Sequence, residues 1–545
     1  MTVHAPPSVA AQLAATIADE GCEHLFTLMG AGNLWVIHHL ATEHGTAIHH
    51  LRHENGAVGA ADGHARATGE IGWCTVTQGP GFTNTITALL TASRGRSPVI
   101  LLVSDTSNLD PERFPFAGGV QALPPEVLLE PLGIACVRVD GTDASQKMRE
   151  VVARVRANRE TVAFIMPAGL DRIPADEPAE RIAPRSPIGD TVSEGALAAA
   201  VRALQNAQNP LILAGMGAID ARAGDAVAAL AERVAAHVTT SVPASGIIGD
   251  HPLSAGQFGG FSVGATEKLI LDADVIVAVG ASLNTFQSRS GALIDGRTVI
   301  RIDTDSDRRI TGDIAQRIDL VGDAQSVTRT LCDRLGSSGF IPRPVRELSP
   351  LAVADDRSMT GAIDPRTLSL VLDELLPLDR RIIVDNGHFG AFPMIYLTHR
   401  APRSLIWLPD FGAVGSALAA AYASATVDSH TQSVLFIGDC GLYMTLGDLE
   451  TAVRERTPLI IVCMNDGAAG SELVHMGDWG VPGDQAIFGY ADLAAVARGM
   501  GAQGASVRTL ADLKPALEAW DRSTGPLLLD CHISRNVRSP IYDHV

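Results

Sequence analysis

Cysteine and positive charge are both scarce in this chain of 545 residues. The seven cysteines are scattered without a CxxC pair or zinc-ligand spacing, which predicts free thiols in a reducing compartment. Lysine and arginine total 42 against 61 for aspartate and glutamate, and no basic cluster offsets the net charge of −19. Nucleic acid, whose phosphates attract basic proteins, is therefore excluded as an expected partner.

Long apolar runs are missing as well. No stretch of membrane-spanning length is free of glycine, proline or charge, and residues 1–12 lack the basic-then-apolar order of a signal peptide. These absences predict a cytoplasmic protein with no membrane partner. The composition, 46% hydrophobic and 19% charged, is that of ordinary globular domains, and the length requires roughly two to four of them.

The chain does contain a repeated alternation of short β-branched runs with helical patterns, which predicts parallel sheets covered by helices. Stretches rich in proline and charge at 173–187 and 340–366 divide this alternation into three parts. We predict an α/β protein with three doubly wound parallel-sheet domains. Their expected ranges are 1–172, 188–339 and 360–533, followed by a polar C-terminal tail at 534–545.

Residues 434–470 are the most informative stretch of the sequence. Apolar runs at 434–437 and 459–464 have the length of buried strands, and a helical pattern lies between them. Asp439 follows the first run and Asp466 follows the second. In an open parallel sheet both acids would lie at the carboxyl edge, where ligands bind.

Two acids beside glycine-rich backbone and a helix N-terminus suit a metal ion that bridges to a diphosphate. Backbone N–H groups and the helix dipole attract phosphate oxygens, and carboxylate and carbonyl oxygens are the ligands that Mg²⁺ prefers. The alternative interpretation is a plain α/β crossover whose acids are only solvated.

This stretch resembles the thiamine diphosphate motif, in which a Gly-Asp-Gly triplet is followed further along by Asn-Asn. The resemblance implies that Asp439, Asp466 and the backbone carbonyl of Ala468 bind Mg²⁺. It places Gly438, Cys440 and Gly441 at the cofactor. Two residues depart from the motif, because Cys440 replaces a glycine and Asp466 replaces an asparagine. The first adds a Cβ, and the second adds negative charge beside the metal.

A second signature lies in the first domain. The segment RHENGAVGAADGHARATG, residues 52–69, resembles the one that carries the catalytic glutamate in the acetolactate synthase branch of thiamine diphosphate enzymes. The turn TQGPGFTN, residues 77–84, matches the Gly-Pro-Gly turn of that branch. The resemblance implies that Glu54 bonds to the pyrimidine of the cofactor and activates it, and that Gly81 lies against the cofactor. The alternative for Glu54 is an ordinary first-turn glutamate favoured by the helix dipole.

Two further segments resemble cofactor-binding parts of the family. VDNGHFG, residues 384–390, resembles a strand-end loop that touches the diphosphate, which makes Asn386, Gly387 and His388 candidates. DFGAVGSALAAA, residues 410–421, places Val414 where an aliphatic residue props the bent cofactor. His388 could equally be a capping or surface histidine, and Val414 could be simple core.

Three residues are candidates for contact with substrate. Gln121 aligns loosely with an active-site glutamine of the family, and Glu472 lies where the decarboxylase branch carries an acid near the substrate. His475 follows in a segment that shapes the substrate pocket of relatives. A surface glutamate on a helix is the alternative for Glu472.

The resemblance, to acetolactate synthase and benzoylformate decarboxylase-like enzymes, covers nearly the whole chain. It implies a carboligase or lyase, dependent on thiamine diphosphate and Mg²⁺, that acts on a 2-oxo acid or 2-hydroxy ketone through ylide attack and an enamine intermediate. Alternatives are a 2-oxo acid decarboxylase, a flavin-dependent oxidase or acyl-CoA lyase, and a non-catalytic cofactor-binding paralogue. FAD or ADP could bind the central domain, which could also bind nothing.

The resemblance also implies an assembly. It predicts a homodimer or homotetramer, in which Glu54 of one chain serves the cofactor that is held by Asp439 of another.

Overall fold

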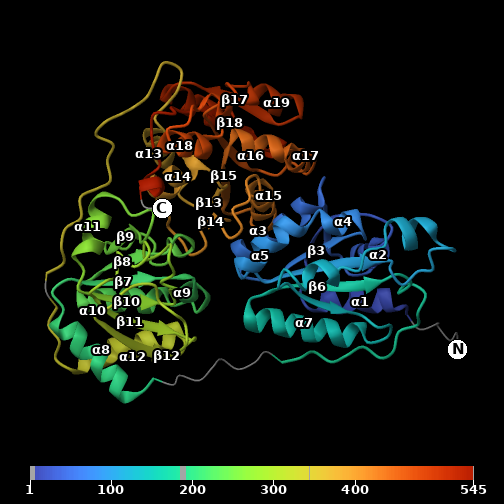
Figure 1. The fold of residues 1–545 in the computed structure, drawn as a ribbon, viewed down its shortest axis with the longest axis horizontal. Helices are drawn as coiled ribbons and strands as arrows, with labels where there is room; N and C mark the ends of the chain where they lie inside the picture. The colour runs from blue at the N-terminus through green and yellow to red at the C-terminus, as the bar shows by residue number, and fades with distance from the viewer. Residues whose placement is uncertain (1–6, 184–191, 343, 544–545) are drawn as a thin grey trace.

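The computed structural model describes residues 7–183, 192–342 and 344–543. Within these residues the chain forms three six-stranded sheets, and every pair of neighbouring strands in them is parallel (Figure 1). Helices cover both faces of each sheet, which confirms the predicted α/β class with three doubly wound domains. None of the helices among the described residues combines the length and apolar character needed to cross a bilayer.

The N-terminal sheet has the strand order β2-β1-β3-β4-β6-β5. Its strands are β1 (His24–Leu28), β2 (Ala47–His50), β3 (Gly72–Val76), β4 (Val99–Asp105), β5 (Ala135–Arg138) and β6 (Thr161–Pro167). Its helices are α1 (Val9–Asp19), α2 (Leu34–Glu43), α3 (Glu54–Thr68), α4 (Pro80–Thr83), α5 (Ile86–Arg94), α6 (Glu126–Leu129) and α7 (Ala144–Asn158).

The central sheet has the order β12-β11-β10-β7-β8-β9. Its strands are β7 (Pro210–Ala214), β8 (His237–Thr240), β9 (Ser254–Gln257), β10 (Val275–Val279), β11 (Thr298–Asp303) and β12 (Gln316–Val321). Its helices are α8 (Glu194–Asn206), α9 (Met216–Asp220), α10 (Gly224–Val234), α11 (Gly264–Asp272) and α12 (Ala324–Ser337).

The C-terminal sheet has the order β14-β13-β15-β16-β18-β17. Its strands are β13 (Arg380–Val384), β14 (Leu405–Trp407), β15 (Gln432–Gly438), β16 (Ile460–Asn465), β17 (Gln503–Val507) and β18 (Leu527–His532). Its helices are α13 (Pro365–Leu375), α14 (Ala391–Tyr396), α15 (Ala417–Val427), α16 (Asp439–Met444), α17 (Leu446–Arg454), α18 (Gly470–Asp478), α19 (Leu493–Gly499) and α20 (Leu513–Glu518).

Three local expectations differ from the structure. The single helical pattern expected between the two strands forms two helices that meet at Thr445, and Met444 at the end of the first is 68% exposed. The start of the 173–187 linker packs on the N-terminal domain, because the N–H of Val9 donates to the carbonyl of Ile173 at 2.8 Å. In the C-terminal tail, residues 540–543 form a short 3₁₀ helix, η7, packed on the C-terminal domain.

The N- and C-terminal domains meet through α3 and α15, which pack along each other (Figure 1). Small residues bring these helices close, since a Cβ added to Gly63 would lie 2.3 Å from the Cα of Ala420. Charged pairs flank the contact, and Arg66 of α3 donates to Asp410 at 2.7 Å while Arg52 donates to Glu450 at 2.6 Å. The helix that begins at Glu54 is thereby fixed against the C-terminal domain of its own chain.

Candidate functional site

Asp439 and Asp466 lie together at the carboxyl edge of the C-terminal sheet. Gly438 at the end of β15 pairs with Met464 of β16, so the acids that follow these strands are neighbours. Both side chains are buried. Burial raises the pKa of Asp439 to about 6, and burial together with the charge of Asp439 raises the pKa of Asp466 to about 7. Two buried acids of like charge favour a bound cation.

Cys440 and Ala468 stand beside this pair. The Cys440 thiol donates to the carbonyl oxygen of Ala468 at 3.6 Å, the oxygen that the motif assigns to the metal. Cys440 lies in α16 with negative φ, so its Cβ causes no backbone strain at the position where the motif has glycine. Burial, followed by the charges of Asp439 and Asp466, raises the pKa of this thiol to about 11, which keeps it protonated at neutral pH.

Gly441 is needed for close packing against Asp385. A Cβ at Gly441 would lie 2.4 Å from Oδ2 of Asp385. The same carboxylate accepts from the backbone N–H of Gly415 at 2.7 Å and of Ala417 at 3.3 Å, which ties the end of β13 to the start of α15. Burial raises the pKa of Asp385 to about 7, although these backbone bonds act in the opposite direction. The sequence did not single out Asp385, although its place directly after a buried strand was the available signal.

The loop after β13 carries the candidates Asn386, Gly387 and His388, and each has a different environment. Both hydrogens of the Asn386 amide nitrogen are used within the domain, to the carbonyls of Leu408 at 2.8 Å and Ala413 at 2.7 Å. Asn386 therefore anchors the loop that precedes α15, and its side-chain donors are not available to a diphosphate. Gly387 presents only backbone and lines a cavity that is described below.

His388 is buried, which rules out the surface interpretation. Its Nε2 accepts from the backbone N–H of Ser539 at 2.9 Å, and its ring lies 5.6 Å from that of Tyr542. Burial lowers the pKa of His388 to about 4, so the ring is neutral at physiological pH. His388 thus links the loop after β13 to the C-terminal segment.

In the N-terminal domain, Glu54 begins α3 and lies beside the glycine turn. Its Oε2 accepts from the amide of Asn84 at 2.9 Å, and Oε1 would be 3.6 Å from a Cβ built on Gly81. The closest neighbour of that Cβ position is Cγ2 of Thr77 at 2.8 Å, so packing against Thr77 accounts for the glycine at position 81. Asn84 was not predicted, although its place in the matched turn could have indicated it.

Gln121 lies close to the same turn. Its side-chain oxygen accepts from Nε2 of Gln78 at 2.9 Å, and Gln78 in turn accepts from the hydroxyl of Thr77 at 2.6 Å. A Cβ on Gly79 would lie 2.6 Å from the backbone oxygen of Gln121. The structure therefore brings Gln121 to the turn that carries Gly81 beside Glu54, and its contact with substrate stays a prediction.

The remaining candidates surround the C-terminal site. Glu472 lies on α18, and its charge acts on both Cys440 and Tyr542. His475, one turn later, stacks on Trp479 with ring centroids 5.5 Å apart and lines the cavity beside Gly387. Val414 is 41% exposed, which contradicts the core alternative and leaves its side chain free to contact a ligand.

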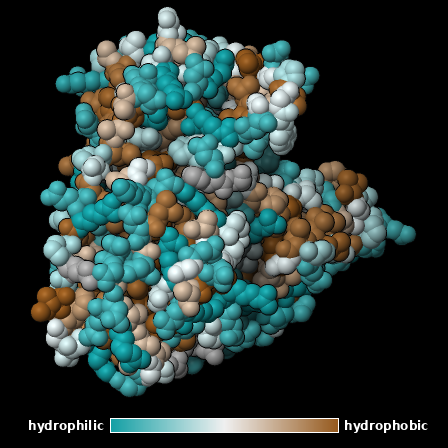
Figure 2. Space-filling model, turned by 60° about the vertical axis from the view of Figure 1, so that its left-hand side comes forward, coloured by the Kyte–Doolittle hydropathy of each residue, from teal (hydrophilic) through white to brown (hydrophobic). Residues whose placement is uncertain are grey.

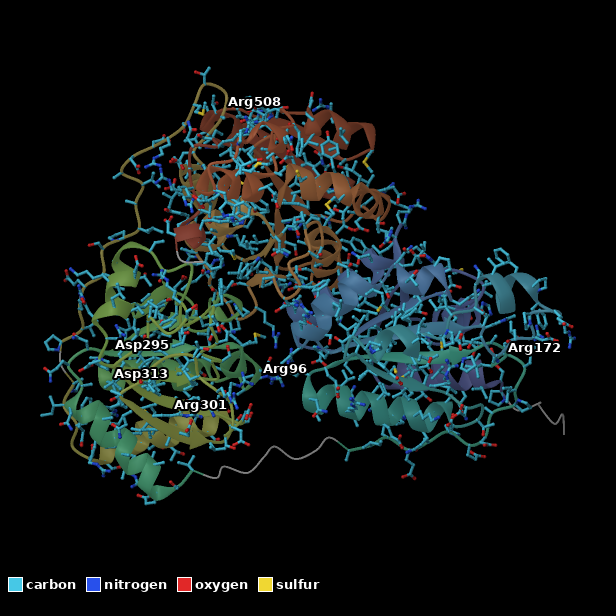
Figure 3. All side chains as sticks on the ribbon, in the orientation of Figure 1. Arg96, Arg172, Asp295, Arg301, Asp313 and Arg508 are labelled. Carbon is cyan, nitrogen blue, oxygen red and sulfur yellow. The ribbon has the colours of Figure 1, made fainter. Side chains whose placement is uncertain are left out.

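Two cavities adjoin these groups. One, of about 480 Å³, lies beside Gly387 between the central and C-terminal domains. The other, of about 550 Å³, lies where all three domains meet at the carboxyl edge of the central sheet. Arg96 lines this second cavity, and Figure 3 shows it on the side of the N-terminal domain that faces the central domain.

The glycines of the central domain have a packing role. A Cβ on Gly215, at the end of β7, would lie 2.2 Å from the carbonyl oxygen of Gly280 at the end of β10. Close approach of these two strand ends therefore explains the glycines without a bound nucleotide.

The C-terminal residues fit a divalent cation and a diphosphate. Within the described residues neither Asp439 nor Asp466 forms an ion pair, and both carboxylates and the Ala468 carbonyl are hard oxygen ligands. Gly470 leaves the Asp466 carboxylate uncovered, because a Cβ there would lie 2.5 Å from its Oδ2. A divalent cation bound to these oxygens could in turn hold a diphosphate.

Three family descriptions match the chain. They are "Thiamine pyrophosphate enzyme, N-terminal TPP binding domain" at residues 7–121, the central domain of the same enzymes at 197–331, and their C-terminal TPP binding domain at 385–531. The matched ranges fall on the three sheets described above.

Individual proteins are similar over most of the chain. A probable 2-ketoarginine decarboxylase of Pseudomonas aeruginosa is 30% identical over 83% of this chain and 81% of its own length. The acetolactate synthase large subunit of Parasynechococcus marenigrum is 26% identical over 98% of this chain and 89% of its own. A solved thiamine diphosphate-dependent 4-hydroxybenzoylformate decarboxylase of Rhodococcus jostii RHA1 has the same fold, with TM-score 0.81, 18% identity, and coverage of 97% and 100% of the two chains.

Proposed function

The chain belongs to the thiamine pyrophosphate enzymes, and from that premise we propose that it is a Mg²⁺-dependent carboligase or lyase acting on a 2-oxo acid or 2-hydroxy ketone. Decarboxylation of a 2-oxo acid without carboligation is the nearest alternative within this proposal. The seven cysteines of the chain are free thiols, which supports a location in the reducing cytoplasm.

The pairing of Asp439 with Asp466 is the observation that carries the proposal. Burial raises the pKa values of both acids, and the charge of Asp439 raises that of Asp466 further, so a divalent cation would relieve the unfavourable charge at Asp466. We assign Asp439, Asp466 and the Ala468 carbonyl as the Mg²⁺ ligands. The backbone of Gly438, Cys440 and Gly441, at the start of α16, is assigned to the diphosphate.

The proposed cofactor supplies a carbon nucleophile and an electron sink when bound. Glu54 is assigned the pyrimidine ring, because its carboxylate projects beside Gly81 with Asn84 as its only hydrogen-bond donor among the described residues. There it would hold and release a proton at the ring nitrogen. Gln121 and Glu472 are assigned to the substrate, with Glu472 delivering or accepting a proton. Val414 is assigned the apolar support beneath the cofactor.

Two copies of the chain would complete each site. Glu54 belongs to the N-terminal domain and Asp439 to the C-terminal domain, and neither a hydrogen bond nor an ion pair among the described residues joins them. The N-terminal domain exposes apolar side chains suited to an interface, and Figure 2 shows hydrophobic surface gathered on the right-hand lobe. These side chains are Met29, Leu34, Trp35, Phe116, Val120 and Val127. We propose a homodimer or homotetramer with shared sites.

Substitution of Glu54 tests the assignment. Glu54→Gln keeps the shape and the hydrogen bond to Asn84 but cannot exchange a proton, so cofactor-dependent turnover of 2-oxo acids should fall by about 100-fold or more. Glu70→Gln, at the exposed far end of α3, is the matched control and should behave as wild type. Unchanged turnover in Glu54→Gln would remove this residue from the mechanism. If Glu54→Gln loses turnover but still binds the cofactor, Glu54 has a chemical role and the binding site itself is intact.

A bound nucleotide is the second candidate function. The cavity of about 550 Å³ at the carboxyl edge of the central sheet has Arg96 in its wall, which favours an anionic ligand such as FAD or ADP, whereas Arg308 in the same wall is paired with Asp303 and Asp305. An oxidase or an acyl-CoA lyase would use such a ligand. Mass spectrometry and the absorbance spectrum of small molecules released from the native protein test this. A flavin spectrum would support the oxidase, and release of no nucleotide would remove both alternatives.

A further inference from the structure

We infer that the cavity of about 480 Å³ beside Gly387 receives the substrate's side chain, and that this side chain is an uncharged aromatic group. The inference rests on the proposed function, since it names the substrate class for the same site. It follows from the walls of the cavity, from its charge, and from its position relative to the paired acids.

The walls of the cavity are aromatic rings set at angles to one another. Phe261 of the central domain meets Trp407 of β14 edge to face, with ring centroids 5.2 Å apart at 76°. On the opposite side His475 stacks on Trp479, and Tyr542 of η7 meets His475 at 5.3 Å and 74°. Such a set offers both ring faces and ring edges to a planar guest. The volume lies within the usual range of roughly 300–1,000 Å³ for small-molecule sites.

The cavity has no free charge for a charged guest. Asp478 is the one acid or guanidinium in its described lining, and both its oxygens are taken by Arg538 at 2.8 and 2.9 Å. Arg538 also lies 5.8 Å from the ring centroid of Tyr542. A guanidinium side chain would therefore find no unpaired carboxylate in the described lining and would meet the like charge of Arg538, although the charge of Glu472, which lies outside that lining on α18, acts on Tyr542. A carboxylate side chain would find no unpaired cation in the described lining.

The cavity lies next to the loops that surround Asp439 and Asp466. Gly387 and Ser471 line it, and each is next to a residue that frames the paired acids. A Cβ on Gly470 would touch Asp466 on one side and lie 3.3 Å from the Cβ of His388 on the other. A molecule whose carbonyl lies at the C-terminal site can thus place its side chain among the rings. One relative acts, by its name, on 2-ketoarginine, whose side chain is cationic, so the inference separates this chain from that protein.

Binding and turnover are measured on the holoenzyme loaded with thiamine diphosphate and Mg²⁺. Calorimetry with the non-reacting acids 3-phenylpropionate, 5-guanidinopentanoate and propionate should give 3-phenylpropionate the highest affinity, on the order of 10- to 100-fold above propionate. Carbon dioxide release from phenylpyruvate, 2-oxo-5-guanidinopentanoate and pyruvate should follow the same order in kcat/KM.

The outcomes distinguish the inference from the proposed function. Preferred binding and turnover of the guanidino acid or of pyruvate would overturn the inference and leave the proposed function standing. Preferred binding of 3-phenylpropionate without turnover of any 2-oxo acid, alone or with an aldehyde acceptor, would retain the cavity assignment and overturn the proposed function. Equal or absent binding of all three acids would overturn the cavity assignment whatever the turnover.

A variant changes the charge of the cavity directly. Trp479 is 74% exposed, so Trp479→Asp should fold, while removing one ring and adding an unpaired carboxylate. We expect affinity for 3-phenylpropionate to fall at least tenfold and affinity for 5-guanidinopentanoate to rise. Leu378→Asp is the control, because Leu378 is 65% exposed and lies outside the cavity lining. An unchanged preference in Trp479→Asp, with thermal unfolding like that of the control, would contradict the inference.

Discussion

The thiol of Cys440 donates to the carbonyl oxygen of Ala468 across 3.6 Å, and that oxygen is also the assigned third ligand of Mg²⁺. The bond joins the start of α16 to the loop after β16. The oxygen has two lone pairs, so a cation can bind while the thiol bond persists, but the thiol occupies one of them and weakens the oxygen as a metal ligand.

We expect Cys440→Gly to bind Mg²⁺ more tightly than wild type. A thiol–carbonyl bond is worth about 0.5–1 kcal/mol, so its loss should lower the half-saturating Mg²⁺ concentration by about two- to fivefold. Titration calorimetry in the presence of thiamine diphosphate measures this. Cys332→Ala, in the central domain, is the control. Weaker binding in Cys440→Gly would mean that the thiol supports the loop instead of weakening the oxygen as a ligand.

The acid at position 466 should make Mg²⁺ binding depend on pH. The pKa values of about 6 for Asp439 and about 7 for Asp466 lie above the ordinary value of 3.8, so protons compete with the ion below neutrality. Affinity should rise by about tenfold per pH unit between pH 6 and 7, and level off above pH 8. In Asp466→Asn the group with the higher pKa no longer titrates, so the rise should end at lower pH, near the pKa of about 6 of Asp439. The same pH profile for both proteins would contradict the pairing of the acids.

Asp448 offers a test of stability against pH. This buried residue of α17 has Oδ1 without a hydrogen-bond partner among the described residues, and burial raises its pKa to about 7. Its carboxylate presses on α3, because a Cβ on Gly56 would lie 2.5 Å from Oδ1. The native state therefore binds more protons than the unfolded state from about pH 4 to pH 7, and its stability falls as pH rises through that window.

Asp448→Asn should remove this loss. Relative to wild type, its free energy of unfolding should increase between pH 4 and pH 7 by up to a value on the order of 4 kcal/mol, and stay constant above pH 8. Urea unfolding of both proteins at pH 4.5 and pH 8 measures the difference. If the two proteins differ in free energy of unfolding by the same amount at pH 4.5 and pH 8, Asp448 ionises as freely in the native state as in the unfolded chain.

The contact between α3 and α15 should be intolerant of added volume. Gly63→Ala places a methyl group 2.3 Å from the Cα of Ala420 and should cost about 1–3 kcal/mol. Gly195→Ala is the matched control, because Gly195 lies in α8 with nothing within 4 Å of its Cβ position, and it should gain about 0.4–1 kcal/mol. Thermal unfolding compares the two. Similar effects of both substitutions would argue against close packing at Gly63.

Sequence patterns predicted the three sheets because parallel strands buried on both faces are continuous β-branched runs, as in 434–437. They also placed Asp439 and Asp466 at the same edge of the sheet, since each residue directly follows a strand. They could not give the direction of a side chain within a loop. The side-chain amide of Asn386 donates to the carbonyls of Leu408 and Ala413, and His388 accepts a hydrogen bond from the backbone of Ser539. These partners are distant in the chain.

Hydrogen bonds between residues distant in the sequence could not be predicted for the same reason. Asp385 stabilises the start of α15 from 30 residues away, and Asn84 bonds Glu54 across 30 residues. Periodicity reports which residues are buried, but it does not report which polar atoms meet. The aromatic cavity is the clearest case, because its walls come from the central domain, β14, α18 and η7.

The close seating of Gly63 on Ala420 has a mechanical consequence. Because backbone packs against backbone with ion pairs on either side, we expect the outer two domains of one chain to move together. Any opening that admits substrate must then arise elsewhere, in the segment around Val414, in α18, or in the tilt of the central domain. Labels that report distance should detect motion across those elements and none between α3 and α15.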